Sequence, residues 1–259
     1  MHDLGLDAPA RTAGTAWWAP HKFIARLAVT PGVTQPSLTS AGADWVTTLH
    51  PRWLSRRVWA GQLRDVTNSD LWRGAVGVTV FAKAAEIKLH RLPARAYGTT
   101  GGFTGDAETA GLTPASMVVL SEPVEFTGEY RCFIAPEPNT GKPTVVASSA
   151  YLVDGQTWDA WETREFAPDT AEAVTFAQAV VDDTAGPSGY VLDVGRLADG
   201  TWAVVEPNAS WSSNPYHCEP AGVVASILAA QHPTGDPAWA WQPDPCLARY
   251  TRPLPVRTA

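Results

Sequence analysis

Three oxygen-bearing side chains near one turn of the chain have the types and spacing of a metal site. Asp199 and Gly200 give the strongest hairpin signal in the sequence. A two-residue turn there places Asp193 opposite Glu206, and Asn208 follows two residues later on the same face of its strand. Opposed carboxylates repel each other, and a divalent cation removes that repulsion; hard oxygen ligands suit magnesium. The spacing therefore makes all three candidate magnesium ligands.

Two alternatives remain open at this hairpin. Both carboxylates can lie at a solvated edge and point into water, in which case no metal is needed. A turn of three residues shifts the register and places Val205, rather than Glu206, opposite Asp193.

Lysine is scarce in this chain, which makes its positions informative. Only four of the nineteen basic residues are lysines. Lys83 ends an apolar, strand-like run and Lys88 follows five residues later, so the two ammonium groups can hold phosphate oxygens as point charges. The alternative is a lysine at a strand end beside a solvated neighbour.

A second pair of charges lies on a strand-like segment. Glu129 and Arg131 are two residues apart, so both side chains point to one face of the strand. The guanidinium fork of an arginine there binds a phosphate or a carboxylate. The alternative is a local ion pair, which contributes less than about 1 kcal/mol if it is exposed.

The elements that must position these residues indicate an α+β fold. Residues 99–105, Thr-Thr-Gly-Gly-Phe-Thr-Gly, have the composition of a loop or a lid over the site. Asp169 and Glu172 fit a capping pair at the start of a helix, and a second helix is expected after Pro220. The expected strands and the hairpin are residues 77–83, 117–126, 129–135, 144–153 and 189–208.

The composition of the 259 residues excludes several classes of protein. With 26 acidic and 19 basic residues, the net charge of −7 is opposite to that of a typical nucleic-acid binder. No apolar run approaches the ~18 residues of a membrane helix, and no secretory signal opens the chain. Three cysteines without metal-site spacing favour a cytoplasmic protein. The P-loop, dinucleotide-binding and α/β-hydrolase motifs are missing.

The order of five short motifs resembles the ATP-grasp superfamily. The motifs are Val-Phe-Ala-Lys (80–83), Ser-Glu-Pro-Val (121–124), Glu-Tyr-Arg (129–131), Val-Leu-Asp-Val-Gly (191–195) and Val-Glu-Pro-Asn (205–208). They are most similar to a little-characterised bacterial and phage branch that is related to RimK-type ligases. The resemblance covers residues 75–232. It implies two α+β subdomains that sandwich a nucleotide, with residues 1–74 as a short N-terminal region and 233–259 as a Pro/Trp-rich tail packed on the body.

The resemblance also implies roles for individual residues. Lys83 would contact phosphate with Lys88 as a second lysine, and Arg131 would meet the γ-phosphate or an acyl-phosphate. Glu122 and the backbone of Val124 would bind adenine, and Glu129 belongs to the same nucleotide-binding set. ATP and magnesium are the expected cofactors, with the metal on Asp193, Glu206 and Asn208.

The activity implied by the resemblance is ATP-dependent ligation of a carboxylate to an amine through an acyl-phosphate. The expected partners are small-molecule or peptide carboxylates and amines, and a homodimer is compatible with the sequence. Substitution of Asp193 by Asn or of Glu206 by Gln is expected to abolish ATP turnover and leave the fold intact. Two other functions remain open: a kinase that phosphorylates a small molecule with the same apparatus, and a non-catalytic module that binds nucleotide.

Overall fold

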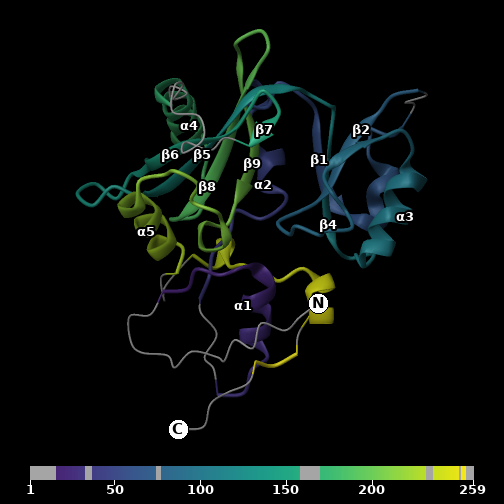
Figure 1. Ribbon diagram of the computed structural model, residues 1–259, viewed down its shortest axis with the longest axis horizontal. Helices are drawn as coiled ribbons and strands as arrows, with labels where there is room; N and C mark the ends of the chain where they lie inside the picture. Colours follow the sequence, from purple (N-terminus) through teal and green to yellow (C-terminus); the bar gives the residue numbers. More distant parts are fainter. Residues whose placement is uncertain are drawn as a thin grey trace.

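The chain folds around two antiparallel sheets that lie side by side (Figure 1). The computed structural model describes residues 16–32, 37–73, 77–157, 170–231, 236–250 and 252–254. A four-stranded sheet has the order β1-β4-β2-β3, and a five-stranded sheet has the order β7-β6-β5-β8-β9. With helices packed on both sheets, this architecture confirms the predicted α+β class.

The four-stranded sheet presents one face to a core and the other to a cleft. Its strands are β1 (Val58–Gln62), β4 (Met117–Ser121), β2 (Val80–Ala84) and β3 (Arg95–Tyr97). Because side chains alternate along a strand, Ala82 of β2 is buried in the core while Phe81 and Lys83 line the cleft. The cleft face therefore receives the lysine that ends the apolar run.

The glycine-rich segment after β3 is a helix, so the prediction of a loop or lid was wrong. Helix α3 (Thr100–Ala110) begins at Thr99, whose hydroxyl accepts a hydrogen bond from the N–H of Gly102. Phe103 and Ala107 are fully buried, and they pack against the core face of the sheet. The capping hydroxyl and this apolar pair outweigh the weak helix propensity of the glycines.

The five-stranded sheet is covered by one helix on each face. Its strands are β7 (Gln156–Thr157), β6 (Pro143–Val153), β5 (Phe126–Pro136), β8 (Tyr190–Leu197) and β9 (Trp202–Asn208). Helix α4 (Ala171–Asp183) packs on the face that contains Cys132, and α5 (Pro220–Ala229) packs on the face that contains Phe133. A Cβ atom at Gly222 of α5 would lie 2.2 Å from the carbonyl oxygen of Val146, so glycine permits this close approach.

Both predicted helices of this part are present. Helix α4 follows Thr170, which makes no side-chain capping bond, and Glu172 lies in its first turn. Asp169, the other member of the predicted capping pair, lies outside the described residues. Helix α5 begins at Pro220, as expected, with the Glu219 side chain accepting from the N–H of Ala221.

The hairpin of β8 and β9 has the predicted pairing at the acidic residues but a different turn. The N–H of Leu197 donates to the carbonyl of Thr201, so the turn has three residues rather than two. A bulge between Asp193 and Val194 then restores the pairing of Asp193 with Glu206. Arg56 donates hydrogen bonds to the carbonyl oxygens of Val204 and Val205, at 2.8 and 3.0 Å, on the bulged strand. The two deviations cancel at the site.

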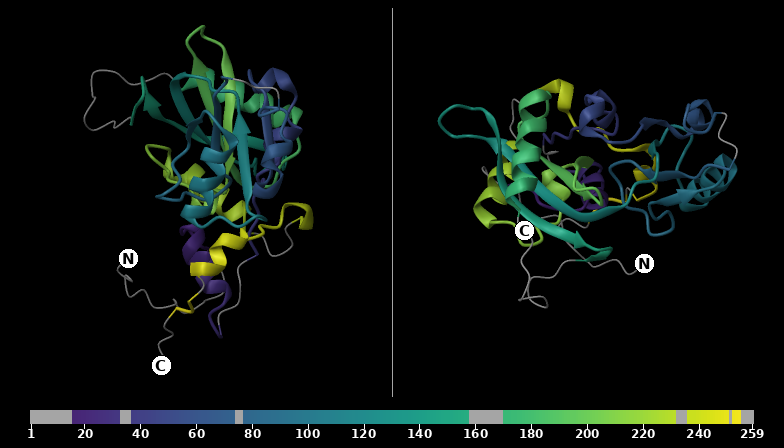
Figure 2. Two further views of the ribbon diagram at one scale, coloured as in Figure 1. Left: turned by 90° about the vertical axis from the view of Figure 1, so that its right-hand side faces the viewer. Right: turned by 90° about the horizontal axis from the view of Figure 1, so that it is seen from above.

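The N-terminal region is more regular than its composition suggested. Strand β1 pairs with β4, with Val58 opposite Ser121, so the expected division after residue 74 falls between two strands of one sheet. The remaining elements before β2 are α1 (His21–Ala28), α2 (Trp45–Thr48), η1 (Pro51–Trp53) and η2 (Leu63–Asn68). Figure 2 shows α1 beside the C-terminal segment, below the two sheets.

The C-terminal segment contacts both parts of the molecule. Cys246 and Leu247 are buried in the core of the four-stranded sheet, while Trp241 packs against that core and against a third core around Trp211. The short elements of this part are η3 (Ser210–Ser212), η4 (Pro237–Trp239) and η5 (Pro245–Tyr250). Among the described residues, no helix has both the length and the apolar character that a bilayer crossing requires.

Candidate functional site

A cleft of about 860 Å³ lies between the two sheets and contains most of the predicted site residues. Six of the nine predicted residues line it, and they come from both sheets and the segments that follow their strands: Lys83, Lys88, Val124, Glu129, Glu206 and Asn208. The other three, Glu122, Arg131 and Asp193, do not line the cleft.

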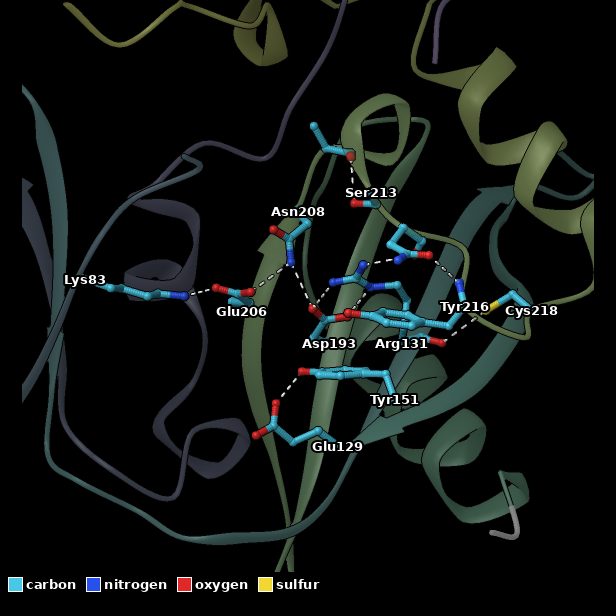
Figure 3. A network of polar contacts seen from close by, with 12 residues as sticks. Lys83, Glu129, Arg131, Tyr151, Asp193, Glu206, Asn208, Ser213, Tyr216 and Cys218 are labelled. Carbon is cyan, nitrogen blue, oxygen red and sulfur yellow. Dashed lines mark hydrogen bonds and ion pairs between the residues drawn. The ribbon is translucent and has the colours of Figure 1, made fainter. Parts of the chain in front are cut away.

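Asp193 lies beneath the cleft in a buried ion pair with Arg131 (Figure 3). Both carboxylate oxygens accept from the guanidinium, at 2.9 Å from Nε and 2.7 Å from Nη2. The third guanidinium nitrogen donates to the carbonyl of Asn214 at 3.0 Å. Burial by itself lowers the pKa of Arg131, but the Asp193 carboxylate outweighs burial and holds that pKa above its usual value. The fork predicted to contact a phosphate thus orients an acidic side chain in this structure.

Two tyrosines enclose this ion pair on the cleft side. The rings of Tyr151 and Tyr216 stack with centroids 5.1 Å apart, and the guanidinium carbon of Arg131 lies 5.4 and 5.0 Å from them. The Tyr151 hydroxyl donates to Glu129, which lines the cleft. Burial raises the pKa of the Glu129 carboxyl, although this hydrogen bond acts in the opposite direction. The arrangement keeps Arg131 and Asp193 away from water.

Glu206 forms the contact between the two sheets. Its carboxylate pairs with the ammonium group of Lys83, which reaches across the cleft from β2 (Figure 3). The side chains of Lys83 and Glu206 are 20% and 24% exposed, against 4% and 0% for Arg131 and Asp193. Burial lowers the pKa of Lys83 to about 8. Lys88 lines the same cleft as an exposed side chain.

Asn208 connects the two carboxylates. Its amide nitrogen donates to Asp193 at 2.9 Å and to Glu206 at 3.1 Å. Each carboxylate has its own cation, so their opposition does not by itself require a metal, contrary to the expectation from the sequence. In the described part of the chain, no group of three or more His, Cys, Asp or Glu side chains is placed to hold an ion. The magnesium prediction therefore depends on two carboxylates and one amide.

These three side chains fit the chemistry of a magnesium site. The amide nitrogen of Asn208 marks a point within hydrogen-bonding distance of an oxygen from each carboxylate. Rotation of that amide by 180° exchanges its nitrogen for its oxygen, which turns a donor into a third hard ligand. The donor set is then two carboxylate oxygens and one amide oxygen.

Glu122 and Val124, predicted to bind adenine, differ in position. Glu122 pairs with Arg57, whose backbone N–H and Nε each donate to the carboxylate at 2.8 Å. This pairing lowers the pKa of the Glu122 carboxyl. Val124 lines the cleft next to the apolar side chains of Phe81 and Val119.

Sequence reasoning missed several residues of the site. Arg56 lines the cleft and holds the carbonyls of the bulged strand, and burial lowers its pKa to about 10. Tyr151 and Tyr216 come from a strand and a loop that carried no motif. Glu86, between the two predicted lysines, also lines the cleft. The one sequence signal was the adjacent arginines 56 and 57 before a strand, within a region interpreted as irregular.

One protein-family model matches most of the chain. Residues 21–228 match a model described as an ATP-grasp domain, the third family of its clade. The matched residues include every predicted site residue. A comparison with curated proteins gave no significant match.

Comparison with solved structures gives distant similarities. The N5-carboxyaminoimidazole synthetase from Staphylococcus aureus, complexed with ADP, has a TM-score of 0.39 at 13% identity over 68% of this chain and 46% of that one. The ATP-grasp ligase PsnB, complexed with a phosphomimetic variant of its minimal precursor, Mg and ADP, has a TM-score of 0.42 at 14% identity over 73% and 56%. A RimK domain ATP-grasp protein from Sphaerobacter thermophilus has a TM-score of 0.40 at 11% identity over 67% and 60%. This chain therefore spans about half the length of these proteins.

Proposed function

The chain belongs to this family of ATP-grasp domains, because the family's model matches residues 21–228, and from this premise we propose that it is an ATP-dependent ligase. The proposed reaction joins a small-molecule or peptide carboxylate to an amine. ATP phosphorylates the carboxylate with the help of magnesium, and the resulting acyl-phosphate reacts with the amine. The nucleotide would occupy the cleft between the two sheets.

The observation that carries this proposal is the polar contact across the cleft. Lys83 from one sheet meets Glu206 from the other, beside Asn208 and above the buried Asp193. An ammonium group that rests on a carboxylate can exchange that partner for phosphate oxygens when a nucleotide enters. Lys88 adds a second positive charge on the same wall. The cleft thus offers cations from β2 and its following segment, and oxygen ligands from β8 and β9.

The fit of Asp193, Glu206 and Asn208 to magnesium supports the metal dependence. When bound, the ion supplies positive charge against the phosphate oxygens of the nucleotide. Arg131 holds Asp193 in one orientation through two hydrogen bonds, so this side chain is positioned before any ligand arrives. Glu206 instead has to release Lys83, which couples metal binding on one sheet to phosphate binding on the other.

The reaction has two balanced steps. An oxygen of the substrate carboxylate attacks the γ-phosphorus, the bond to the bridging oxygen breaks, and ADP leaves. The amine nitrogen then attacks the carbonyl carbon of the acyl-phosphate, the carbon–oxygen bond breaks, and inorganic phosphate leaves while the nitrogen loses its proton. Lys83 and Lys88 would stabilise the charge on the transferred phosphoryl group, since positioning and electrostatics account for most of the catalysis in such transfers.

The experiment that tests the proposal uses hydroxylamine as a general amine. The purified chain is incubated with ATP, magnesium, hydroxylamine and a library of carboxylic acids, and the products are measured by mass spectrometry. We expect hydroxamates of one class of acid, with ADP and free phosphate in equal amounts. Glu206→Gln should abolish the products, whereas Glu108→Gln, on the exposed side of α3, is the matched control for loss of one charge.

Two results would contradict ligation. A stable phosphoester, formed with ADP and without free phosphate, would assign the chain as a kinase. Binding of ATP without magnesium-dependent turnover on any acid or alcohol would assign it as a non-catalytic nucleotide-binding module.

A further inference from the structure

Glu86 lines the cleft, and neither the nucleotide nor the metal ligands account for it. It lies on the segment between Lys83 and Lys88, where the chain leaves β2. Its carboxylate accepts a hydrogen bond from the Ser40 hydroxyl, which comes from the N-terminal region. The same end of the cleft is lined by Gly42 and by His21 at the start of α1.

The backbone at Glu86 is held in a strained conformation. Its φ of 52° lies in the left-handed region, which non-glycine residues without a short polar side chain rarely occupy. The N–H of Ile87 donates to the carbonyl of Ala85 at 2.5 Å, so Glu86 is the central residue of a three-residue turn of the strained, positive-φ kind. A glycine would adopt this conformation without cost. Strain at a side chain that faces a cleft is a reason to look for a ligand.

The Glu86 carboxylate also lacks a compensating cation. Within the residues that the structure describes, no lysine or arginine forms an ion pair with it: Lys83 pairs with Glu206 instead. The acidic groups whose charge acts on it are Asp244 and Asp44. Burial, followed by these like charges, raises the pKa of Glu86, while the hydrogen bond from Ser40 acts in the opposite direction. An ionised carboxylate in such surroundings is stabilised by a cationic ligand.

The chemistry of this subsite fits an ammonium group better than a metal ion. One carboxylate and one hydroxyl are too few oxygen ligands for a divalent cation, which needs six or more. An ammonium group has three N–H donors and can form an ion pair with the carboxylate while it donates to a hydroxyl or a carbonyl. Glu86 is three residues from Lys83 and lines the same cleft, so a ligand held there lies at the end of the cleft beyond the phosphate-binding lysines.

We propose that Glu86 and Ser40 form the subsite that binds the amine substrate, through its ammonium group. This inference rests on the proposed ligase function and adds to it: the acceptor is a primary amine that is cationic at neutral pH. Glu86 recognises the amine before the reaction and takes no part in phosphorylation of the carboxylate.

The test measures binding of amines to the full chain in the presence of ADP and magnesium. The probes are a panel of amino-acid amides, each a cationic amine, and their N-acetyl counterparts, which are neutral; binding is followed by NMR. We expect some amides to bind the wild-type chain and to bind Glu86→Gln at least about 10-fold more weakly, which corresponds to about 1.4 kcal/mol. The acetylated probes should not distinguish the two proteins, and Glu108→Gln should bind like the wild type.

Two further readouts separate recognition from a structural role. Because Gln keeps the acceptor for Ser40 and removes a buried charge beside two acidic groups, Glu86→Gln should unfold at the same temperature as the wild type or higher. Hydroxylamine is neutral at pH 7, so hydroxamate formation should be unchanged in Glu86→Gln. Equal amine binding by both proteins, absence of binding by every amide, or a lower unfolding temperature would overturn the inference. Absence of hydroxamate formation by the wild type would refute the ligase function and leave the amine-binding result to be judged separately.

Discussion

The two sheets contribute to the site in different ways. On the five-stranded sheet, Arg131 and Asp193 are buried and joined by two hydrogen bonds, with two tyrosines packed over them. On the four-stranded sheet, Lys83 is 20% exposed and reaches across to Glu206 through a single ion pair. One sheet therefore holds a ligand in a fixed position, and the other offers a charge that can change its partner.

This difference has a physical origin in the cost of separating charges. Removing one partner of a buried ion pair leaves the other charge without water or a counterion, which is strongly destabilising. Breaking a partly exposed pair costs little, because solvent takes over both groups. The same acidic chemistry is thus structural at Asp193 and adjustable at Glu206.

The largest expected effect comes from breaking the buried pair. Asp193→Asn leaves the Arg131 guanidinium buried without a counterion, so the free energy of unfolding should fall by about 3–5 kcal/mol. Urea denaturation measures this loss. The sequence predicted an intact fold for this variant, and the structure now separates it from Glu206→Gln, which should lose less than about 1 kcal/mol. Equal losses in the two variants would remove the distinction between the sheets.

Glu206→Gln tests the adjustable side through activity. The variant keeps the fold but loses a charged oxygen ligand next to Asn208, so magnesium-dependent ATP turnover should fall about 10²–10³-fold. Release of ADP with the carboxylate found in the hydroxylamine screen measures it. Turnover at the wild-type rate would exclude Glu206 from the metal site.

The pH dependence of nucleotide binding isolates Lys83. Its pKa is about 8, so the side chain is cationic below that pH and loses its charge as the pH rises through 8. The affinity for ATP should therefore be constant at pH 6–7 and fall about 10-fold toward pH 9.5. Lys83→Met should bind weakly at every pH, whereas Lys142→Met, which removes a lysine that lies just before β6 and pairs with Asp182, should keep the wild-type profile. A wild-type affinity that does not change with pH would contradict the role of Lys83.

The smallest expected effect concerns the helix behind the four-stranded sheet. If α3 is a stable helix, Thr99→Ala removes its capping hydroxyl and should lower the free energy of unfolding by about 1 kcal/mol. Gly105→Ala should raise it by about 0.5–1 kcal/mol, because a Cβ atom there meets no other atom within 4 Å. Thermal unfolding measures both changes. A mobile lid in this segment predicts no effect from either substitution.

Much of the fold was predictable because its signals are local. The strands around Lys83, Glu129 and Asp193 and the helix after Pro220 appear where residue alternation and proline placed them. The family match confirms the resemblance to ATP-grasp proteins, which depended on the order of short motifs. Strand β1 was missed because it is five residues long and only partly buried, without the alternation of apolar and polar residues that marks a strand.

The site was predictable only as a set of residue types. Opposed carboxylates can be found from a hairpin, and the pairing of Asp193 with Glu206 was correct. The partners that neutralise them come from elsewhere: Arg131 is 62 residues from Asp193, and Lys83 belongs to the other sheet. No local pattern reports such contacts. The turn was misjudged because Asp-Gly favours a two-residue loop, while a bulge held by Arg56 compensates for the third residue.

The most direct test of this account is the effect of magnesium on nucleotide affinity in two proteins. Calorimetry measures the binding of a non-hydrolysable ATP analogue, with magnesium and with EDTA, to the wild-type chain and to Glu206→Gln. We predict that magnesium strengthens binding to the wild type about 10-fold or more and that this gain is lost in the variant. The same gain in both proteins would show that Glu206, and with it the contact across the cleft, has no part in holding the metal.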